Sequence, residues 1–284
     1  MADKNTVFHQ KLSLNVQGKL IELSHPKIMG ILNLTPDSFY EGGQNKDPVQ
    51  ALKKAGELLS DGADFLDIGA YSSRPGAEHI SEQEEYSRLI PVVKLIVHEF
   101  PDAILSIDTF RSGIARAAIN EGAHIINDIS AGEMDAEMFD TVASLKVPYI
   151  LMHMKGTPQT MASKAKYQDI VTEVCHYFAL KIEVLIQLGV KDLIIDPGFG
   201  FSKTPAQSYE ILKNLEYLKI TGYPILAGLS RKSMIYKILD TDAEHALYGT
   251  IAANTIALMK GANILRVHDV KAAVEAVKII KKVI

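Results

Sequence analysis

Carboxylate and amide side chains occur at the ends of several short apolar segments of this sequence. Asp108 ends the segment ILSID, Asn127 lies near the end of HIIND, and Asp196 ends DLIID. A carboxylate in such a place is partly removed from water, and its two oxygens can accept parallel N–H bonds from an amidine-like ring edge. Pterins and guanines carry an edge of that kind. We therefore expect Asp196 to bind this edge, with Asp108 and Asn127 serving the rest of the ring.

A cationic pair near the C-terminus suits an anion. In Arg266-Val267-His268 the first and third side chains share one face of a strand, because strand side chains alternate with period two. Both can then point toward one anion. Asn33, at the end of the first expected barrel strand, adds a neutral oxygen for phosphate oxygens or for an Mg2+ that bridges them. His268 alone is explained equally well as a cap of the next helix, but the Arg-x-His spacing favours the anion.

The segment SRKS, residues 230–233, adds hydroxyls and a lysine. Ser230 and Ser233 lie where a helix is expected to begin, and free N–H groups at a helix start favour a carboxylate or a phosphate. Lys232 can reach into the same site. Taken alone, SRKS is equally typical of a solvated basic helix start. Asp108 likewise has a second possible role as a cap of the helix that follows it, and its two roles are compatible.

Eight short β-branched or aliphatic segments would position these residues, and a longer amphipathic segment follows each of them. This alternation predicts parallel strands joined by helices. The expected strands are residues 27–33, 64–69, 104–108, 124–127, 148–153, 192–196, 223–227 and 263–267. The predicted fold class is α/β, a (β/α)8 TIM barrel, in which active sites form at the carboxyl ends of the strands. The chain of 284 residues is long enough for one barrel, which typically needs about 250.

Glycine precedes four of the expected strands, in SDGADFLDIG, NEGAHIIND, QLGVKDLIID and MKGANILRV. Each of these glycines is expected to end the preceding helix in a left-handed conformation. Before the barrel, VFHQKLSLNVQGKLIELS predicts two strands around residues 16–18, a hairpin that closes the bottom of the barrel. No linker interrupts the sequence. We therefore expect one domain over residues 1–284, with the hairpin in 1–26 and the barrel in 27–284.

Composition argues against several other classes of protein. The formal net charge of −4 and the isoelectric point near 6.1 give no footprint of a nucleic-acid partner. No apolar run approaches the roughly 18 residues of a membrane span, and MADKNTVFHQ lacks a signal pattern, so we expect a cytoplasmic protein with no membrane partner. Cys175 is the only cysteine, and its helical context predicts a small buried hydrophobe. No zinc-binding pattern such as His-Glu-x-x-His is present.

Eight ordered motifs resemble one enzyme family. They are NLTPDSF, DIG leading to SSRPGA, IDTFR, INDIS, LMHMKGTP, DPGFGF, SRKS and RVHDV. In this order, and over nearly the whole chain from residue 27, they resemble the signature segments of dihydropteroate synthases. The resemblance implies a (β/α)8 barrel that forms a homodimer and uses Mg2+. It also implies a step of folate biosynthesis that joins 6-hydroxymethyl-7,8-dihydropterin pyrophosphate to p-aminobenzoate, giving 7,8-dihydropteroate and pyrophosphate.

The resemblance further implies a role for individual residues. The pterin would be held by Asp108, Asn127, Asp196, Lys232 and Arg266. The pyrophosphate would be held by Asn33, Ser72, Arg74, Arg266 and His268, and Asn33 would also be the metal ligand. The p-aminobenzoate would contact Phe39, Ser73, Arg74, Pro75, Phe201, Lys232 and Ser233. The implied catalytic residues are Asp108, Asp196, Lys232, Arg266 and His268.

The chain departs from the family pattern at a few positions. Ser73 stands where the family has Thr, Ala70 and Tyr71 stand where it has Gly-Glu, and Ser202 stands where it has Gly. The first two departures fall in a Gly-rich loop, residues 70–81, which together with residues 35–47 we expect to act as a mobile lid. Such lids would exclude water from the reaction.

The implied chemistry needs no covalent enzyme intermediate. Mg2+, Arg266 and His268 would stabilise the charge of the leaving pyrophosphate, while Asp108 and Asp196 would favour the cationic pterin that remains. The amine of p-aminobenzoate can then attack carbon. The sequence agrees with this scheme, because it contains no activated Ser or Cys nucleophile.

Three other functions stay open at this level. A methyltetrahydrofolate:corrinoid methyltransferase-like barrel would share the pterin site but handle no pyrophosphate, and the SRPG, SRKS and RVH segments argue against it. A non-catalytic pterin-binding homologue would act as a sensor or scaffold, and intact Asn33, Arg74 and Arg266 argue against that. A Schiff-base aldolase built on Lys232 is disfavoured, because this lysine belongs to a helix start beyond the strand.

Overall fold

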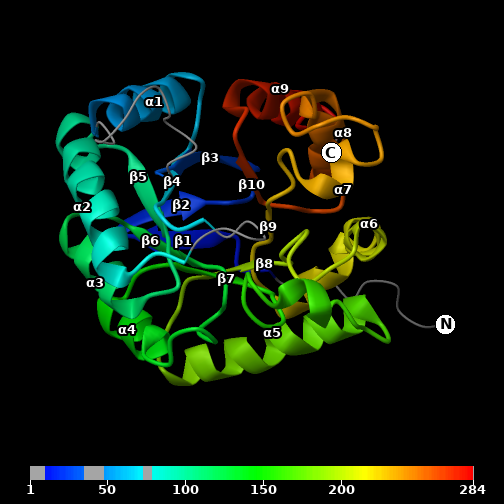
Figure 1. Ribbon diagram of the computed structural model, residues 1–284, viewed down its shortest axis with the longest axis horizontal. Helices are drawn as coiled ribbons and strands as arrows, with labels where there is room; N and C mark the ends of the chain where they lie inside the picture. The colour runs from blue at the N-terminus through cyan, green and yellow to red at the C-terminus, as the bar shows by residue number, and fades with distance from the viewer. Residues whose placement is uncertain (1–9, 35–47, 73–78, 284) are drawn as a thin grey trace.

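A computed structural model describes residues 10–34, 48–72 and 79–283 of the chain. Eight parallel strands form the inner wall, and helices surround them on all sides (Figure 1). The strands are β3 (Lys27–Asn33), β4 (Phe65–Gly69), β5 (Ile104–Asp108), β6 (Ile125–Asp128), β7 (Tyr149–Met152), β8 (Leu193–Asp196), β9 (Leu226–Ala227) and β10 (Ile264–Val267). The predicted (β/α)8 barrel is thus confirmed.

Helices follow these strands along the chain and cover the outside of the barrel (Figure 1). The α-helices are α1 (Pro48–Ser60), α2 (Glu82–Glu99), α3 (Ser112–Asn120), α4 (Met138–Leu145), α5 (Ile170–Gln187), α6 (Pro205–Lys213), α7 (Ser233–Tyr236), α8 (Leu247–Met259) and α9 (Val270–Ile280). Two 3-10 helices, η2 (Met161–Lys164) and η3 (Leu215–Thr221), lie in the connections. Among the helices in the described ranges, none combines the length and apolar character that crossing a bilayer requires.

The strands are ordered β8-β7-β6-β5-β4-β3-β10-β9, and each neighbouring pair is parallel. The barrel closes between β8 and β9. There the Ile195 N–H donates to the Pro224 carbonyl at 2.9 Å, next to a single parallel bridge between Ile195 and Ile225. Closure brings the carboxyl ends of all eight strands to one mouth.

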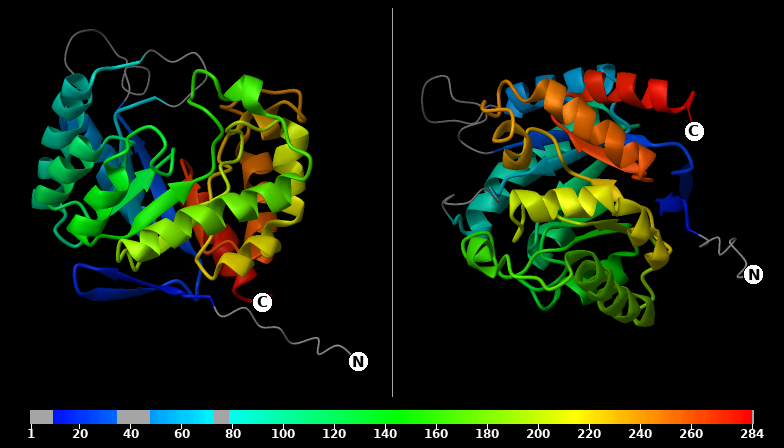
Figure 2. Two further views of the ribbon diagram at one scale, coloured as in Figure 1. Left: turned by 90° about the horizontal axis from the view of Figure 1, so that it is seen from below. Right: turned by 90° about the vertical axis from the view of Figure 1, so that its right-hand side faces the viewer.

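An N-terminal hairpin covers the opposite end of the barrel (Figure 2). Its strands, β1 (Ser13–Val16) and β2 (Lys19–Glu22), pair in antiparallel register. Leu14, Val16 and Leu23 are buried in one cluster with residues from the first positions of the barrel strands, such as Met29 and Phe65. The hairpin therefore closes the bottom by continuing the hydrophobic core, as the sequence predicted.

Local predictions agree with the structure in most places. Gly62, Gly122, Gly189 and Gly261, which precede four strands, all have positive φ angles between 85° and 102°. Two details differ. Strand β9 has two residues instead of five, and Cys175 is half-buried against the core instead of fully buried.

Candidate active site

Inside the barrel, an apolar layer of side chains is followed by a mostly polar layer two residues further along the strands. The lowest inward-facing layer joins Met29, Phe65, Ile104, Ile125, Ile150, Ile194, Leu226 and Ile264 with the hairpin. Strand side chains alternate between faces, so the next inward position lies two residues further along each strand. That second layer comprises Ile31, Asp67, Ser106, Asn127, Met152, Asp196, Gly228 and Arg266. Because the apolar layer and the hairpin close the bottom of the barrel, the polar groups of the second layer face the mouth.

Arg266 joins two carboxylates across this layer. Its Nε lies 2.5 Å from Asp67 Oδ2, and its Nη2 lies 2.5 Å from Asp108 Oδ2. Asp67 Oδ2 also accepts a hydrogen bond from Asn127 Nδ2 at 3.0 Å. Arg266, Asp108 and Asn127 were all expected in the site, and the structure brings them together. Asp67 was not expected, although it lies two residues before the end of its strand, where alternation points it inward.

Burial shapes the ionisation of this group. Removal from water raises the pKa of Asp108 to about 7, and the positive charge of Arg266 opposes this shift. Burial disfavours the charged form of Arg266 too, but its two carboxylate neighbours raise the pKa of the guanidinium above its usual value. Arg266 therefore stays charged, while Asp108 can change its protonation near neutral pH.

Asp196 and Lys232 flank Gly228 at the mouth of the barrel. A Cβ atom built on Gly228 would lie 3.7 Å from Asp196 Oδ2 and 4.0 Å from Lys232 Nζ. Asp196 Oδ1 accepts the Gly198 N–H at 2.7 Å, so its other oxygen is the one directed toward Gly228. Burial raises the pKa of Asp196 and lowers that of Lys232 to about 8, and each charge opposes the shift of the other.

Lys232 also contacts the turn that follows β8. Its Nζ donates to the Phe199 carbonyl and lies 4.7 Å from the centroid of the Phe201 ring. An ammonium over an aromatic face is attracted by the ring quadrupole. Phe201, which was expected to border the second substrate, is therefore held beside the residues expected to bind the first.

A buried lysine supports the same turn and was not predicted. Lys203 Nζ lies 2.8 Å from His153 Nδ1 and donates to the carbonyls of His153 and Phe201 at 3.1 and 2.9 Å. Burial, with the charge of Lys203, lowers the pKa of His153 to about 2, so the ring is neutral and accepts at Nδ1. His153, which ends an expected strand, is thus a structural residue in this arrangement.

The side chains of Arg266 and His268 in the RVH segment differ in where they lie. Arg266 reaches into the barrel, while His268 is exposed, with its Nδ1 3.1 Å from Ser230 Oγ. Ser230 Oγ also accepts the His268 N–H at 3.2 Å. The alternative role of His268 as a helix cap is not observed, because Asp269 is the N-cap residue of α9.

Two further expectations about helix starts are corrected. Helix α7, which begins at Ser233, is a single turn of four residues, too short to present the anion site expected at its N-terminus. Asp108 does not cap α3, because the Ser112 N–H there donates to Asp135 Oδ2 at 2.7 Å. Asp108 is instead committed to Arg266.

The remaining expected residues fall at the mouth or outside the described ranges. Asn33 is half-buried at the end of β3, opposite Gly69 in the sheet register. Ser72 and Ser233 are half-buried as well. Four expected residues, the whole of the expected lid 35–47 and half of the expected lid 70–81 lie outside the described residues; the four are Phe39, Ser73, Arg74 and Pro75.

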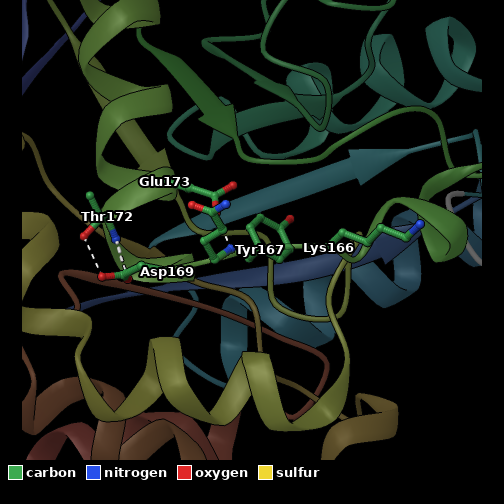
Figure 3. Close-up of a pocket in the computed structure, with 6 residues that line it drawn as sticks. Lys166, Tyr167, Asp169, Thr172 and Glu173 are labelled. Carbon is green, nitrogen blue, oxygen red and sulfur yellow. Dashed lines mark hydrogen bonds between the residues drawn. The ribbon is translucent and has the colours of Figure 1, made fainter.

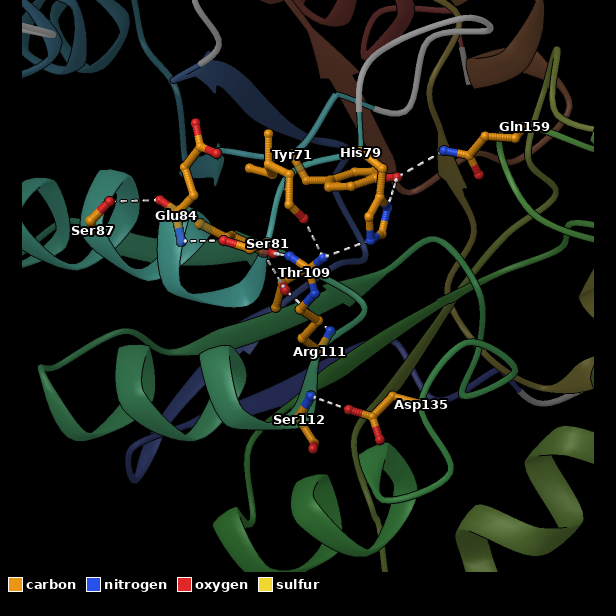
Figure 4. A network of polar contacts seen from close by, with 12 residues as sticks. Tyr71, His79, Ser81, Glu84, Ser87, Thr109, Arg111, Ser112, Asp135 and Gln159 are labelled. Atoms are coloured by element: carbon orange, nitrogen blue, oxygen red, sulfur yellow. Dashed lines mark hydrogen bonds and ion pairs between the residues drawn. The ribbon is translucent and has the colours of Figure 1, made fainter.

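A network of polar contacts supports the strand ends beside the second loop (Figure 4). Tyr71 Oη lies 3.1 Å from His79 Nδ1 and accepts a hydrogen bond from Gln159 Nε2 at 3.0 Å. Arg111 donates to the Ile80 carbonyl at 2.6 Å and pairs with the fully buried Glu85 of α2. Tyr71, where the family has Glu, therefore takes part in an ordered hydrogen-bonded cluster.

Comparison with known proteins agrees with this geometry. A sequence model of the family described as "Pterin binding enzyme" matches residues 29–268. The chain is 42% identical to the dihydropteroate synthase of Escherichia coli strain K12 over 273 residues, which cover 95% of this chain and 96% of that protein.

Solved structures are similar over nearly the whole barrel. The Yersinia pestis dihydropteroate synthase in complex with a sulfonamide drug superposes with a TM-score of 0.90 at 41% identity, covering 95% of this chain and 98% of that one. The Xanthomonas albilineans dihydropteroate synthase with 4-aminobenzoic acid gives a TM-score of 0.89 at 39% identity, covering 96% and 98%. With these matches in sequence, in fold and in the ordered motifs at the barrel mouth, the chain belongs to the dihydropteroate synthase family of pterin-binding enzymes.

Proposed function

We propose that the chain catalyses the condensation of 6-hydroxymethyl-7,8-dihydropterin pyrophosphate with p-aminobenzoate, giving 7,8-dihydropteroate and pyrophosphate. One observation carries this proposal: Asp108, Asn127, Asp196 and Lys232 gather with Arg266 at the mouth of a barrel whose other end is sealed. Family membership over nearly the full chain supports it. A corrinoid methyltransferase-like function has no comparable support.

The pterin binds against the polar layer. Asp196 accepts two parallel N–H bonds from the amidine-like edge, one at Oδ2, which faces Gly228, and one at the second lone pair of Oδ1, whose first lone pair accepts the Gly198 N–H. Asn127 and Asp108 serve the rest of the ring, and Lys232 lies over the same opening. Ionised carboxylates at these positions favour the positive charge that develops on the pterin when the pyrophosphate departs.

The pyrophosphate is bound by Arg266, His268, Ser72 and Asn33. The guanidinium of Arg266 is already paired with Asp67 and Asp108 through Nε and Nη2, so it binds the leaving group through the N–H groups that these carboxylates do not occupy. His268 is exposed beside Ser230, with its Nδ1 3.1 Å from the Ser230 hydroxyl, so an anion can reach its ring from solvent.

Asn33 would also hold Mg2+. Within residues 10–34, 48–72 and 79–283, no three His, Cys, Asp or Glu side chains gather as a metal site. The single amide oxygen of Asn33 nevertheless fits Mg2+, because this ion commonly takes few protein ligands and completes its shell with phosphate oxygens and water. When bound, this ion would neutralise charge on the departing pyrophosphate.

The p-aminobenzoate binds between Phe201 and Ser233, with Lys232 nearby. The Phe201 ring supplies an apolar face for the benzoate ring, and the Lys232 ammonium above it favours a negative carboxylate. The amine then attacks the pterin methylene carbon from this side. The C–O bond to pyrophosphate breaks, a C–N bond forms, and the amine loses a proton.

The deciding experiment is incubation of the purified chain with the pterin pyrophosphate, p-aminobenzoate and Mg2+, followed by chromatography for dihydropteroate. The expected result is product that requires all three components. A chain that binds the pterin in calorimetry but forms no dihydropteroate would instead be a non-catalytic homologue.

We also propose that the chain forms a homodimer through α8. This helix carries an apolar outer face, on which Tyr248, Ile256 and Met259 are exposed. An apolar stripe of this kind is typical of a subunit interface, and a two-fold dimer is the commonest closed assembly. Sedimentation should therefore give a dimer for the native chain and a monomer for Ile256→Arg.

A further inference from the structure

The turn after β8 has an unusual backbone conformation at Ser202. Its φ angle is 45°, in the left-handed region that side chains with a Cβ atom disfavour. Ser202 Oγ accepts the backbone N–H of Lys155 at 2.9 Å. The Tyr167 hydroxyl donates to the Ser202 carbonyl at 3.0 Å and lies 3.3 Å from Ser202 Oγ. Side-chain and main-chain atoms of one buried residue are thus both engaged.

Lys155 fixes Tyr167 as well as Ser202. Its Nζ lies 3.7 Å from the centroid of the Tyr167 ring and pairs with Glu173 at 2.7 Å. Tyr167 and Glu173 are seen from close by in Figure 3, where they line a surface pocket beside the start of α5. We call Lys155, Tyr167 and Ser202 the Ser202 clasp. It ties together the segment after β7, the segment before α5 and the turn after β8.

The clasp lies directly beside Phe201. The Phe201 N–H donates to the Gly198 carbonyl at 3.0 Å, and the Phe201 carbonyl accepts from Lys203 Nζ at 2.9 Å. With Ser202 fixed on its other side, the backbone of Phe201 has little freedom to move. The ring position opposite Lys232 therefore depends on the conformation of Ser202.

We propose that Ser202 and Tyr167 are positioning residues for the second substrate. They hold the Phe201 backbone, and hence the aromatic wall against which p-aminobenzoate binds, without touching the substrate themselves. This inference rests on the placement of p-aminobenzoate against Phe201 proposed above.

The test compares Michaelis constants for the two substrates in Ser202→Ala, Ser202→Gly and Tyr167→Phe. Each change removes the hydrogen bonds that one hydroxyl makes in the clasp, so we expect the KM for p-aminobenzoate to rise about fivefold or more. The KM for the pterin pyrophosphate and kcat should stay within about twofold, because the polar layer is unchanged. The matched control is Thr172→Val, which removes a nearby hydroxyl that bonds to Asp169 at 2.9 Å and should alter neither KM.

The two Ser202 variants separate positioning from backbone compensation. Glycine adopts the left-handed conformation freely but lacks the hydroxyl. If Ser202→Gly keeps the native KM for p-aminobenzoate while Ser202→Ala does not, the hydroxyl only offsets an unfavourable φ angle and the positioning role is wrong. Thermal unfolding of both variants shows separately how much stability the clasp contributes.

Phe201→Ala separates this inference from the substrate placement on which it rests. If Phe201→Ala leaves the KM for p-aminobenzoate unchanged, the placement fails and the clasp role fails with it. If Phe201→Ala raises that KM while Ser202→Ala and Tyr167→Phe do not, the placement holds and only the clasp inference is overturned.

Discussion

Arg266 on β10 bonds to Asp67 on β4, although β3 lies between these two strands in the sheet. The same guanidinium continues to Asp108 on β5, so one side chain links three strands over the top of a fourth. A residue expected only to bind substrate is thus also part of the framework of the barrel. The first prediction follows from this double role.

Asp67→Asn should destabilise the folded chain. Asp67 is fully buried, and its loss of charge leaves Arg266 with Asp108 as the remaining carboxylate. Because Arg266 keeps one carboxylate partner, the expected cost is that of a lost charged hydrogen bond, about 2 kcal/mol in the free energy of unfolding. Urea denaturation measures this cost. The control is Glu216→Gln, which breaks a surface pair with Lys260 and should cost less than about 1 kcal/mol. Equal costs would mean that the buried pair contributes no more than a surface one.

Asp196→Asn should abolish most pterin binding. The Gly198 N–H already selects an oxygen at Oδ1, so the new amide group must point its NH2 toward the pterin. A donor then faces a donor, at a cost of about 2 kcal/mol or more, roughly a 30-fold weaker affinity. Calorimetry with the hydroxymethyl pterin measures it. Asp192→Asn, at the start of the same segment, should bind as the native chain does, and an unchanged affinity in Asp196→Asn would remove Asp196 from the site.

Pterin affinity should depend on the ionisation of Asp108. Burial raises the pKa of this carboxyl to about 7, and only its ionised form accepts N–H bonds with both oxygens. The affinity should therefore rise with pH up to about 7 and level off above it. Asp108→Asn should lack this rise. If the pH profiles of the native chain and Asp108→Asn run parallel, another group controls binding.

The same carboxyl affects folding with a definite sign. Between about pH 4 and about pH 7 the folded chain holds a proton on Asp108 that the unfolded chain has released. The contribution of Asp108 to the free energy of unfolding therefore falls as pH rises through this window. Urea denaturation at several pH values, compared between the native chain and Asp108→Asn, isolates that contribution.

Lys203→Met should destabilise the turn after β8. Methionine keeps the apolar stem but leaves His153 Nδ1 and two carbonyls without their shared donor. Unmet buried acceptors should lower the free energy of unfolding by about 2 kcal/mol. Lys213→Met, at an exposed position near the end of α6, is the control and should be nearly neutral. A more stable Lys203→Met chain would mean that the free-energy cost of burying the lysine exceeds the stabilisation from its three hydrogen bonds.

Much of the fold could be predicted from the sequence because its signals are local. Residues 27–33 and 104–108 match β3 and β5 at both ends, since each is an apolar run that stops at a polar side chain. Strand β9 is shorter than expected for one local and one distant reason. Pro224 has no N–H to donate, and the Ile225 N–H bonds to the side chain of Asn263 in place of a neighbouring strand.

The site was predicted less completely because its contacts join distant segments. Asp67 lies in the middle of β4, where no polar strand end marks it, although strand alternation points its side chain into the barrel. Lys203 and Ser202 lie in a turn where periodicity gives no direction, and their partners come from the segments after β7 and before α5. Such pairings follow from barrel closure, which no local pattern contains.

The hairpin beneath the barrel has a consequence for protons. In the described part of the chain, the apolar layer and the hairpin close the lower end, so water and buffer reach Asp67 and Asp108 from the mouth. A pterin bound across that mouth would close the remaining route. Asp108 would then keep the protonation state it had when the ligand arrived, until the ligand leaves. The protonation state of Asp108 during each turnover would therefore be set when the ligand binds. It would not follow later changes in the pH of the surrounding solution.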